Sequence, residues 1–455
     1  MRDPEGSITL SRDRVTRQLV DANSPAARFL RSPMATTLVH EGHLVPFEFT
    51  SAAIVESPRL PFISYPYEWC DAQLRAAGEL TLEVSREVLS VNYELKDASA
   101  WNVLFNGTRP VFCDHLSFQP IARREWWAFG QFTRHFALPL GLSQHRGLRA
   151  HRVFSMYRDG VPAEDAKKLL GWRGMLSRLW PLMLTTKGAN TSSANERAAS
   201  EVLRPLHPRL YAFCESLLQA PQRRLREESH WSGYAQARQH YTDAAIQAKV
   251  ECVDRWLLAL EGVTAVDLGC NTGEFSAMAA RAGMDVVSVD LDHDCIDNLF
   301  RLTTERGRIH PLVANLSDLS GGRGWGGSEF AGLVTRLKGH ADVLMMLALL
   351  HHLLVSEGIP LQALVNLAAE LTRRYAIVEL IDAQDSMLQR LATQRSRNVD
   401  SLTIAVQLAA FGSRFELMER VDLPGTARTL VLLRLRDSAA GARMPVEGNS
   451  SRQRT

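Results

Sequence analysis

The sequence has few of the features that mark secreted or metal-binding proteins. Its 455 residues include only six cysteines, scattered and without C-x-x-C spacing, so we expect reduced, buried thiols and predict no metal site. The first residues, from Met1 to Glu5, open a polar segment and not the apolar core of a signal peptide. These absences together predict a cytoplasmic location.

Long hydrophobic runs and a strong charge imbalance are also missing. The longest apolar stretch, near residues 344–354, contains two histidines and is too short to cross a bilayer. The formal net charge is only +2, which gives no electrostatic reason to expect nucleic acid or an anionic membrane as a partner. No internal repeat is visible. The chain is long enough for two or three domains with sizeable cores, and its oligomeric state is left open.

The most informative motif that is present is D-L-G-x-N-x-G at residues 267–273. It follows a short apolar strand and precedes a helical pattern, and a second strand at 286–289 ends in Asp290. A strand, a glycine turn and an acid at the end of the next strand are typical of a nucleotide-binding crevice. Gly269 allows the sharp turn, and the missing side chain of Gly273 lets a ligand lie close to the backbone.

This turn differs from the G-x-G-x-x-G of dinucleotide-binding proteins. A pyrophosphate needs a row of free amides at the start of the helix, whereas a sulfonium amino acid needs polar anchors. Asp267 and Asn271 provide such anchors, and Asp290 is placed to accept hydrogen bonds from two ribose hydroxyls. The motif therefore points away from dinucleotides.

Strand and helix patterns alternate from residue 263 to residue 380, which predicts βαβ units and a parallel sheet. The expected strands after the first are 286–289, 309–313, 343–349 and 376–380, and the expected helices are 274–282, 294–306, 330–338 and 360–373. Two β-rich runs, 415–421 and 429–435, flank the turn sequence L-P-G-T and predict an antiparallel hairpin at the end of the sheet.

With this order of elements, residues from about 231 to 436 resemble a class I S-adenosylmethionine-dependent methyltransferase. The matching pieces are the 267–273 turn, Asp290, Asn315 and the apolar strand at 341–349. In that family the turn passes the methionine moiety, the acid holds the ribose, and the residue after strand three meets adenine. Asn315 stands where the family often has Asp. Aromatic residues ahead of the first strand, here Tyr241, commonly cover the cofactor, so the resemblance implies S-adenosyl-L-methionine.

His351 and His352 follow the fourth expected strand, at the edge where ligands bind in open α/β sheets. Histidine can take a proton from a hydroxyl or amine near neutral pH, so both are candidate catalytic residues, with His351 slightly preferred. Methyl transfer also proceeds by proximity alone, and a structural role for both rings is the alternative. Glu379, at the end of the fifth strand, is expected to be a satisfied carboxylate, and Arg428 a solvated arginine.

Asp97, Asn102 and Asp114 form a second constellation nearer the start of the chain. Their spacing resembles the catalytic loop and the metal-binding aspartate of the protein-kinase fold. However, no histidine precedes Asp97 in the usual place, and His115 replaces the glycine after the last aspartate. We interpret this segment as a kinase-like remnant without phosphotransfer activity.

The pairing of this front half with the back half resembles a group of bacterial methyltransferases that includes the nodulation protein NoeA. The stretches that carry this resemblance are 95–118, 347–354, 371–374 and 423–430. The expected organisation is an α+β N-terminal domain at 1–152, a helical linker or cap at 153–260, a Rossmann-like α/β methyltransferase domain at 261–436 and a disordered tail at 437–455.

The resulting functional prediction is a methyltransferase that passes a methyl group to an O or N nucleophile of a small-molecule acceptor. Two alternatives stay open. In the first, the protein is a catalytically silent binding or scaffold protein that keeps the fold. In the second, it is a kinase-like phosphotransferase that uses its N-terminal domain.

Overall fold

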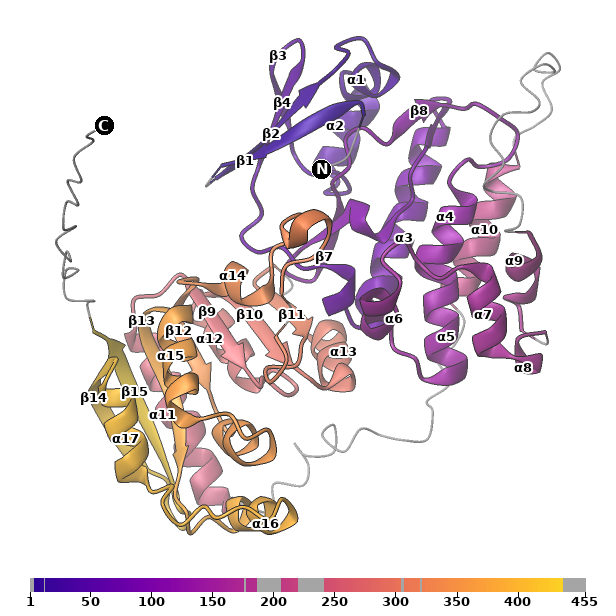
Figure 1. Cartoon of the computed structure of the whole chain (residues 1–455). Coiled ribbons are helices and arrows are strands. Elements are labelled where there is room, and N and C mark those ends of the chain that lie inside the picture. Colours follow the sequence, from indigo (N-terminus) through magenta and orange to yellow (C-terminus); the bar gives the residue numbers. More distant parts are fainter. Residues whose placement is uncertain are drawn as a thin grey trace, which may run out of the picture.

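The protein is described by a computed structural model that covers residues 4–11, 13–175, 177–185, 206–219, 241–303, 307–319 and 321–436. Figure 1 shows an N-terminal region of strands and helices beside a second region built on a larger sheet. The tail predicted at 437–455 and parts of the linker or cap predicted at 153–260 lie outside the described residues. Within the described residues, no helix combines the length and the apolar character needed to cross a membrane.

The N-terminal region starts with a four-stranded antiparallel sheet in the order β1-β2-β4-β3. Its strands are β1 (Gly6–Leu10), β2 (Arg14–Leu19), β3 (Glu48–Ser51) and β4 (Ile54–Pro58). Two short helices, α1 (Pro25–Leu30) and α2 (Pro33–His40), each begin with a Ser-Pro pair. The serine hydroxyl accepts a hydrogen bond from the amide three residues on, and proline fits the first helical position because its missing N–H would have no partner there.

A long helix, α3 (Asp71–Leu89), forms the centre of the rest of this region, with Leu74, Ala77 and Val84 completely buried. Two small strand pairs follow it, β5 (Tyr93–Leu95) with β8 (Phe118–Pro120), and the hairpin of β6 (Val103–Asn106) with β7 (Arg109–Phe112). The remaining helices are α4 (Phe129–Phe132), α5 (Leu138–Arg146), α6 (Ala150–Met156), α7 (Ala163–Leu170), α8 (Trp172–Met175), α9 (Trp180–Thr185) and α10 (His207–Leu218).

The second region is a seven-stranded sheet in the order β11-β10-β9-β12-β13-β15-β14. Its strands are β9 (Thr264–Leu268), β10 (Asp285–Asp290), β11 (Ile309–Val313), β12 (Ala341–Met346), β13 (Thr372–Ile381), β14 (Phe415–Asp422) and β15 (Arg428–Leu435). The first five run parallel, whereas β15 pairs antiparallel with both β13 and β14. The predicted fold class, an α/β Rossmann-like sheet that ends in an antiparallel hairpin, is confirmed.

Side chains of successive residues along each strand enter different cores on the two faces of this sheet. In β12, Val343 and Met345 join the core beneath α11 (Asp243–Ala259), α12 (Glu274–Arg281) and α13 (His293–Leu302). Leu344 and Met346 join the opposite core, beneath α14 (Leu333–Leu337), α15 (Leu361–Leu371) and α17 (Ile404–Gly412). Because both faces are covered, the strands read as continuous apolar runs.

The two regions meet where the N-terminus of α3 lies against α13 and β11. The backbone N–H groups of Asp71 and Ala72, in the first turn of α3, donate to His293 Nε2 at 2.9 Å and to Asp297 Oδ1 at 2.8 Å. The first N–H groups of a helix have no partner within it, so α13 satisfies donors that would otherwise be buried and unpaired. Gln73 Nε2 adds a bond to the carbonyl of Pro311 at 3.0 Å.

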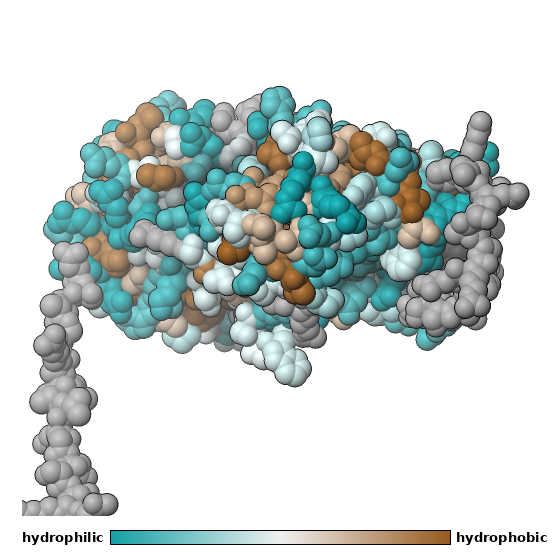
Figure 2. All heavy atoms as spheres, turned by 90° about the horizontal axis from the view of Figure 1, so that it is seen from above, coloured by the Kyte–Doolittle hydropathy of each residue, from teal (hydrophilic) through white to brown (hydrophobic). Residues whose placement is uncertain are grey.

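The structure also departs from the predicted elements before and after the fifth strand, β13. The helix expected at 360–373 ends at Leu371, and its last two residues begin β13. Two helices that were not predicted, α16 (Ser386–Gln394) and α17, connect β13 to β14. Figure 2 shows one face of the molecule, on which hydrophobic residues lie in small separate groups among hydrophilic ones.

Candidate functional site

The glycine turn after β9 adopts left-handed backbone at three positions. Gly269, Asn271 and Gly273 have φ values of 75°, 51° and 83°. A side chain on Gly269 would meet Leu349, and one on Gly273 would come within 2.4 Å of Leu299 on α13. Gly273 is therefore required for backbone conformation and for packing against α13, a different reason from the close ligand approach that we predicted. Gly269 and Asn271 line a cavity, but Gly273 is not among its lining residues.

Asp290 ends β10 beside this turn, and backbone amides hold its carboxylate. Its two oxygens accept hydrogen bonds from the N–H groups of Asn271 and Asp292, both at 2.8 Å. Burial raises the pKa of Asp290, although these amides oppose the shift. No side-chain cation pairs with this carboxylate within the described residues. A carboxylate oxygen can accept more than one hydrogen bond, and Asp290 lines a cavity.

Asn315 and Asp267 are two further residues that the sequence predicted to bind the cofactor. Asn315 follows β11, and its Oδ1 accepts from the amide and the hydroxyl of Ser317 at 3.0 and 2.8 Å, which fixes the orientation of the side chain. Asp267 is buried in β9 and accepts from the hydroxyl of Ser276 at 2.6 Å. Burial and the nearby charge of Asp290 raise the pKa of Asp267 to about 6, against the Ser276 hydrogen bond.

These residues line a cavity of about 980 Å³ at the carboxyl ends of the parallel strands. The cavity spans the point where the strand order reverses, between β9 and β12, which is where open α/β sheets bind ligands. The predicted residues Tyr241, Asp267, Gly269, Asn271, Asp290, Asn315 and His352 all contribute to its lining. The structure therefore brings together seven of the nine residues that the sequence singled out.

A buried ionic network supports one wall of the cavity. The Glu379 carboxylate accepts hydrogen bonds from Lys249 Nζ at 2.5 Å, from the Tyr241 hydroxyl at 2.5 Å and from Arg428 Nη1 at 3.1 Å. Arg428 also pairs with Asp385 at 2.8 Å. Burial opposes ionisation of Glu379, but the two cations outweigh it and lower its pKa to about 2. The prediction of a satisfied Glu379 carboxylate agrees with this geometry.

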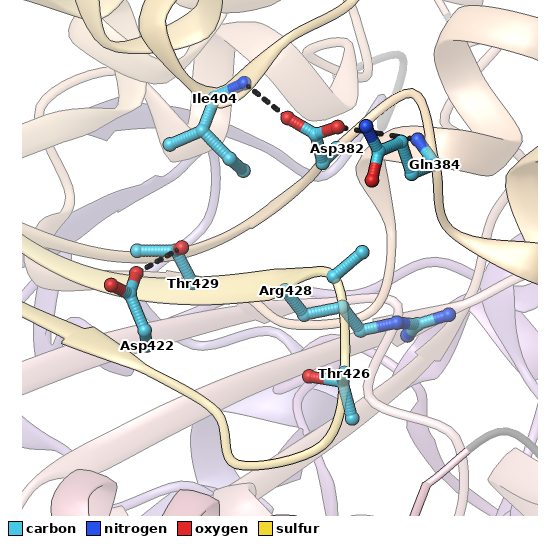
Figure 3. A pocket seen from close by; sticks show the side chains of 8 residues that line it. Asp382, Gln384, Ile404, Asp422, Thr426, Arg428 and Thr429 are labelled. Atoms are coloured by element: carbon cyan, nitrogen blue, oxygen red, sulfur yellow. Dashed lines mark hydrogen bonds between the residues drawn. The ribbon is translucent and has the colours of Figure 1, made fainter.

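The prediction that Arg428 is solvated is wrong, because this side chain is 1% exposed. Its guanidinium pairs with Glu379 and Asp385. Figure 3 shows the side chain extending away from Asp422 and Thr429, with which it lines a second, smaller cavity of about 390 Å³. In that smaller cavity Asp382 accepts from the amide of Ile404 at 3.1 Å, and Asp422 accepts from the hydroxyl of Thr429 at 2.6 Å. Its acids therefore serve the local backbone and hairpin.

The histidine pair follows a strained turn at the end of β12. Ala348 has a φ of 52°, which is uncommon for a residue with a Cβ, and its N–H donates to Glu379 at 3.1 Å. His352 lines the cavity, and burial together with the charge of Arg428 lowers its pKa to about 4. His351 is fully buried and is not a lining residue, although its ring lies 4.0 Å from that of His352. The catalytic role predicted for the pair stays a prediction, and its geometry now favours His352.

In the N-terminal region, Asp97, Asn102 and Asp114 also come together, around the β6–β7 hairpin. Asn102 Nδ2 donates to the backbone carbonyl of Asp97 at 3.3 Å and to Asp114 Oδ2 at 3.4 Å. Arg17, from β2, pairs with Asp114 at 3.1 Å. Burial and the charge of Asp114 raise the pKa of Asp97 to about 6. This cluster lines neither of the two cavities, and its interpretation as a kinase-like remnant stays a prediction.

Sequence reasoning did not single out the residues that close the far end of the large cavity. Met387, Arg390, Leu391, Gln394 and Arg395 come from α16 and its C-cap, and Ser356 and Glu357 come from the segment after His352. The helix was missed although its pattern was present: Asp385 caps the first turn by accepting from the amides of Met387 and Leu388, both at 3.0 Å.

The order of the seven strands, with an antiparallel hairpin at the edge of a parallel sheet, defines the Rossmann-like class I methyltransferase fold. Along almost its whole length the chain is similar to the nodulation protein NoeA of Rhizobium meliloti (strain 1021), with 28% identity over 459 aligned positions that cover 94% of each chain. The resemblance to the NoeA group that the sequence predicted is therefore confirmed. No model of a known protein family matches the chain.

Two similar solved structures each overlap less than half of the chain. The N-methyltransferase NodS from Bradyrhizobium japonicum WM9 is 11% identical, and the match covers 43% of this chain and 98% of NodS with a TM-score of 0.32. Magnesium protoporphyrin IX methyltransferase (ChlM) from Synechocystis PCC 6803, with bound SAH, is 17% identical, with coverages of 45% and 95% and a TM-score of 0.32. The strand order and register carry the fold assignment.

Proposed function

We propose that the protein is an S-adenosylmethionine-dependent methyltransferase that transfers a methyl group to an oxygen or nitrogen nucleophile of a small-molecule acceptor. The observation that carries the proposal is the position of Asp290. Its carboxylate ends the second strand of the sheet, lines a cavity at the switch point of the strand order, and keeps lone pairs for two ribose hydroxyls. This is the placement that ribose binding requires.

The other lining residues fit the remaining parts of this cofactor. The amide Nδ2 of Asn315 has no hydrogen-bond partner among the described residues, so it can donate to an adenine ring nitrogen. Asp267 offers a negative charge to an amino group when it is ionised. The volume of about 980 Å³ is at the upper end of small-molecule sites, which are roughly 300–1,000 Å³, and leaves space for an acceptor.

S-adenosylmethionine, when bound, supplies a methyl group on a positively charged sulfur that is a good leaving group. The chain then has to hold the acceptor in line, keep water out and remove one proton. We assign that proton transfer to His352, because its ring lines the cavity and, with its pKa lowered to about 4 by burial and by the charge of Arg428, is not already protonated at pH 7. The Glu379 network fixes the Ala348 turn from which His352 follows.

The proposal is tested by isothermal calorimetry with S-adenosylhomocysteine on the wild-type protein and on Asp290→Ala. Two hydrogen bonds to a charged group are worth about 3 kcal/mol together, so we expect the variant to bind on the order of 100-fold more weakly. Asp285→Ala is the matched control, because Asp285 starts the same strand at its opposite end and pairs with Arg308. Absence of binding by the wild-type protein would refute the proposal at its first step.

The choice of His352 is tested once a panel of small hydroxyl and amine acceptors yields turnover. We expect His352→Asn to lower kcat by about 100-fold and to leave the affinity for S-adenosylhomocysteine unchanged. Binding without turnover by any acceptor would favour the silent binding protein instead.

A further inference from the structure

The charges around the large cavity are divided between the two halves of the sheet. Acidic residues gather on the side of β9 and β10: Asp267, Asp290, Asp292 and Glu274. Two arginines, Arg390 and Arg395, line it from the segment after β13. Because β13 lies on the other side of β12 from β9, the two groups occupy different ends of one cavity.

Arg390 is presented by one face of α16, and Arg395 follows at its C-cap. Met387, Arg390, Leu391 and Gln394 line the cavity, and their spacing of three, one and three residues places them on a single helical face. The adjacent face is anchored, since Leu388 and Ala392 are buried in a small core with Val355 and Ile381. The helix is therefore held with its arginine-bearing face toward the cavity.

Neither guanidinium has a partner within the described residues. Arg390 and Arg395 make no side-chain hydrogen bond and no ion pair there, whereas the third cation of the lining, Lys249, is paired with Glu379 at 2.5 Å. Glu357 also lines the cavity and offsets part of this positive charge, and His352 is neutral because of its lowered pKa. Two guanidiniums against one carboxylate leave this end positive.

We propose that the methyl acceptor carries an oxyanion, such as a carboxylate or a phosphate, that Arg390 and Arg395 bind. Guanidinium groups match both oxyanions because their planar N–H donors can bond two oxygens at once. His352 lines the same cavity, so an acceptor anchored by its anion at α16 presents its hydroxyl or amine toward this ring. This inference rests on the proposed methyl transfer and names the class of its second substrate.

The test measures ligand-observed NMR dissociation constants for three probes, phenyl phosphate, benzoate and benzyl alcohol, with and without saturating S-adenosylhomocysteine. The variants are the double substitution Arg390→Gln with Arg395→Gln and the control Arg281→Gln. Glutamine keeps helix propensity close to that of arginine, so α16 should still fold. Arg281 is an exposed arginine at the end of α12 that does not line the cavity.

We expect the wild type to bind at least one anionic probe at least tenfold more tightly than benzyl alcohol, and the double variant to lose that difference. The control variant should retain it. A stronger effect on phenyl phosphate or on benzoate tells which oxyanion the site prefers.

Three results would overturn the inference. They are equal affinity of the wild type for charged and neutral probes, an equal loss in Arg281→Gln, and a matching loss of S-adenosylhomocysteine affinity in the double variant, which would assign the arginines to the donor. Anion binding that depends on the arginines in a protein that does not bind S-adenosylhomocysteine would instead refute the methyltransferase proposal alone.

Discussion

Asp290 ends a short strand and Asp114 lies just after one, but different groups hold their carboxylates. Asp114 lies beside the guanidinium of Arg17 and the amide of Asn102, and it lines neither cavity. Asp290 is held by two backbone amides and faces a cavity of about 980 Å³. A carboxylate paired with a cation of its own chain has little attraction left for a ligand, whereas the charge of one held by neutral amides is not offset by a cation. The comparison predicts ligand binding at Asp290 and a structural role at Asp114.

Glu379 extends this comparison into the second region, because it is a cation-paired carboxylate beside the ligand cavity. Breaking a buried pair leaves an uncompensated charge, so we expect Glu379→Gln to lower the free energy of unfolding by about 3–5 kcal/mol, the largest effect on stability. Denaturant unfolding measures it. The control is Glu416→Gln, which removes an exposed pair with Arg434 and should leave the transition unchanged. An unchanged transition for Glu379→Gln would contradict the structural role of the network.

The sign of the pH dependence follows from the lowered pKa of Glu379. The pKa of Glu379 is about 2 in the folded protein and about 4.3 in the unfolded chain. Its contribution to the free energy of unfolding is therefore complete above pH ~4.3 and is lost as the pH falls toward 2.

The next largest effect is expected on ligand affinity and comes from Asp267, whose pKa is raised where that of Glu379 is lowered. Its pKa of about 6 means that the carboxylate is mostly protonated at pH 5, so it no longer attracts a positively charged group. We expect the affinity for S-adenosylhomocysteine to fall about tenfold between pH 7 and pH 5, the fraction ionised falling by about this factor. In the ligand-free protein, the raised pKa makes stability fall as pH rises from about 4 through 6.

Calorimetry across this range checks the prediction for Asp267. The variant Asp267→Asn should show a flat profile, with an affinity at pH 7 close to that of the wild type at pH 5. A wild-type profile without an inflection near pH 6 would remove Asp267 from cofactor binding.

The smallest effect is expected in the N-terminal cluster. Asp97→Asn and Asp114→Asn should each change the affinity for S-adenosylhomocysteine by less than twofold, because neither residue lines the cavity. Calorimetry can also test Mg²⁺ with ATP, for which we expect no heat of binding by the wild type. A Mg²⁺-dependent ATP signal that disappears in Asp114→Asn would contradict a purely structural role for Asp114 and would support the phosphotransferase alternative.

The sequence was sufficient for the parallel part of the sheet, because apolar strands with both faces covered alternate with helices there. The acid at the end of β10 and the turn after β9 could also be placed, since both are local patterns. Their roles were harder to predict, because the role of Gly273 depends on its packing against Leu299 of a different helix, α13.

The Glu379 network and the division of charge could not be predicted from local patterns. Arg428 lies 49 residues from Glu379 and Lys249 lies 130 residues from it, and only the pairing of β13 with β15 and the packing of α11 bring them together. A lone arginine after a hairpin turn is usually solvated, so no pattern in the neighbouring residues predicted that Arg428 is buried. By contrast, α16 was missed although its cap and its amphipathic spacing were both present.

A crystal structure of the protein with S-adenosylhomocysteine tests most directly whether Asp290 and its neighbours form the binding site of S-adenosylmethionine. We predict ligand density in the cavity between β9 and β12, with both ribose hydroxyls within hydrogen-bond distance of the Asp290 carboxylate and with Arg390 and Arg395 free of the ligand. Density elsewhere, or an empty cavity at saturating ligand, would contradict the account.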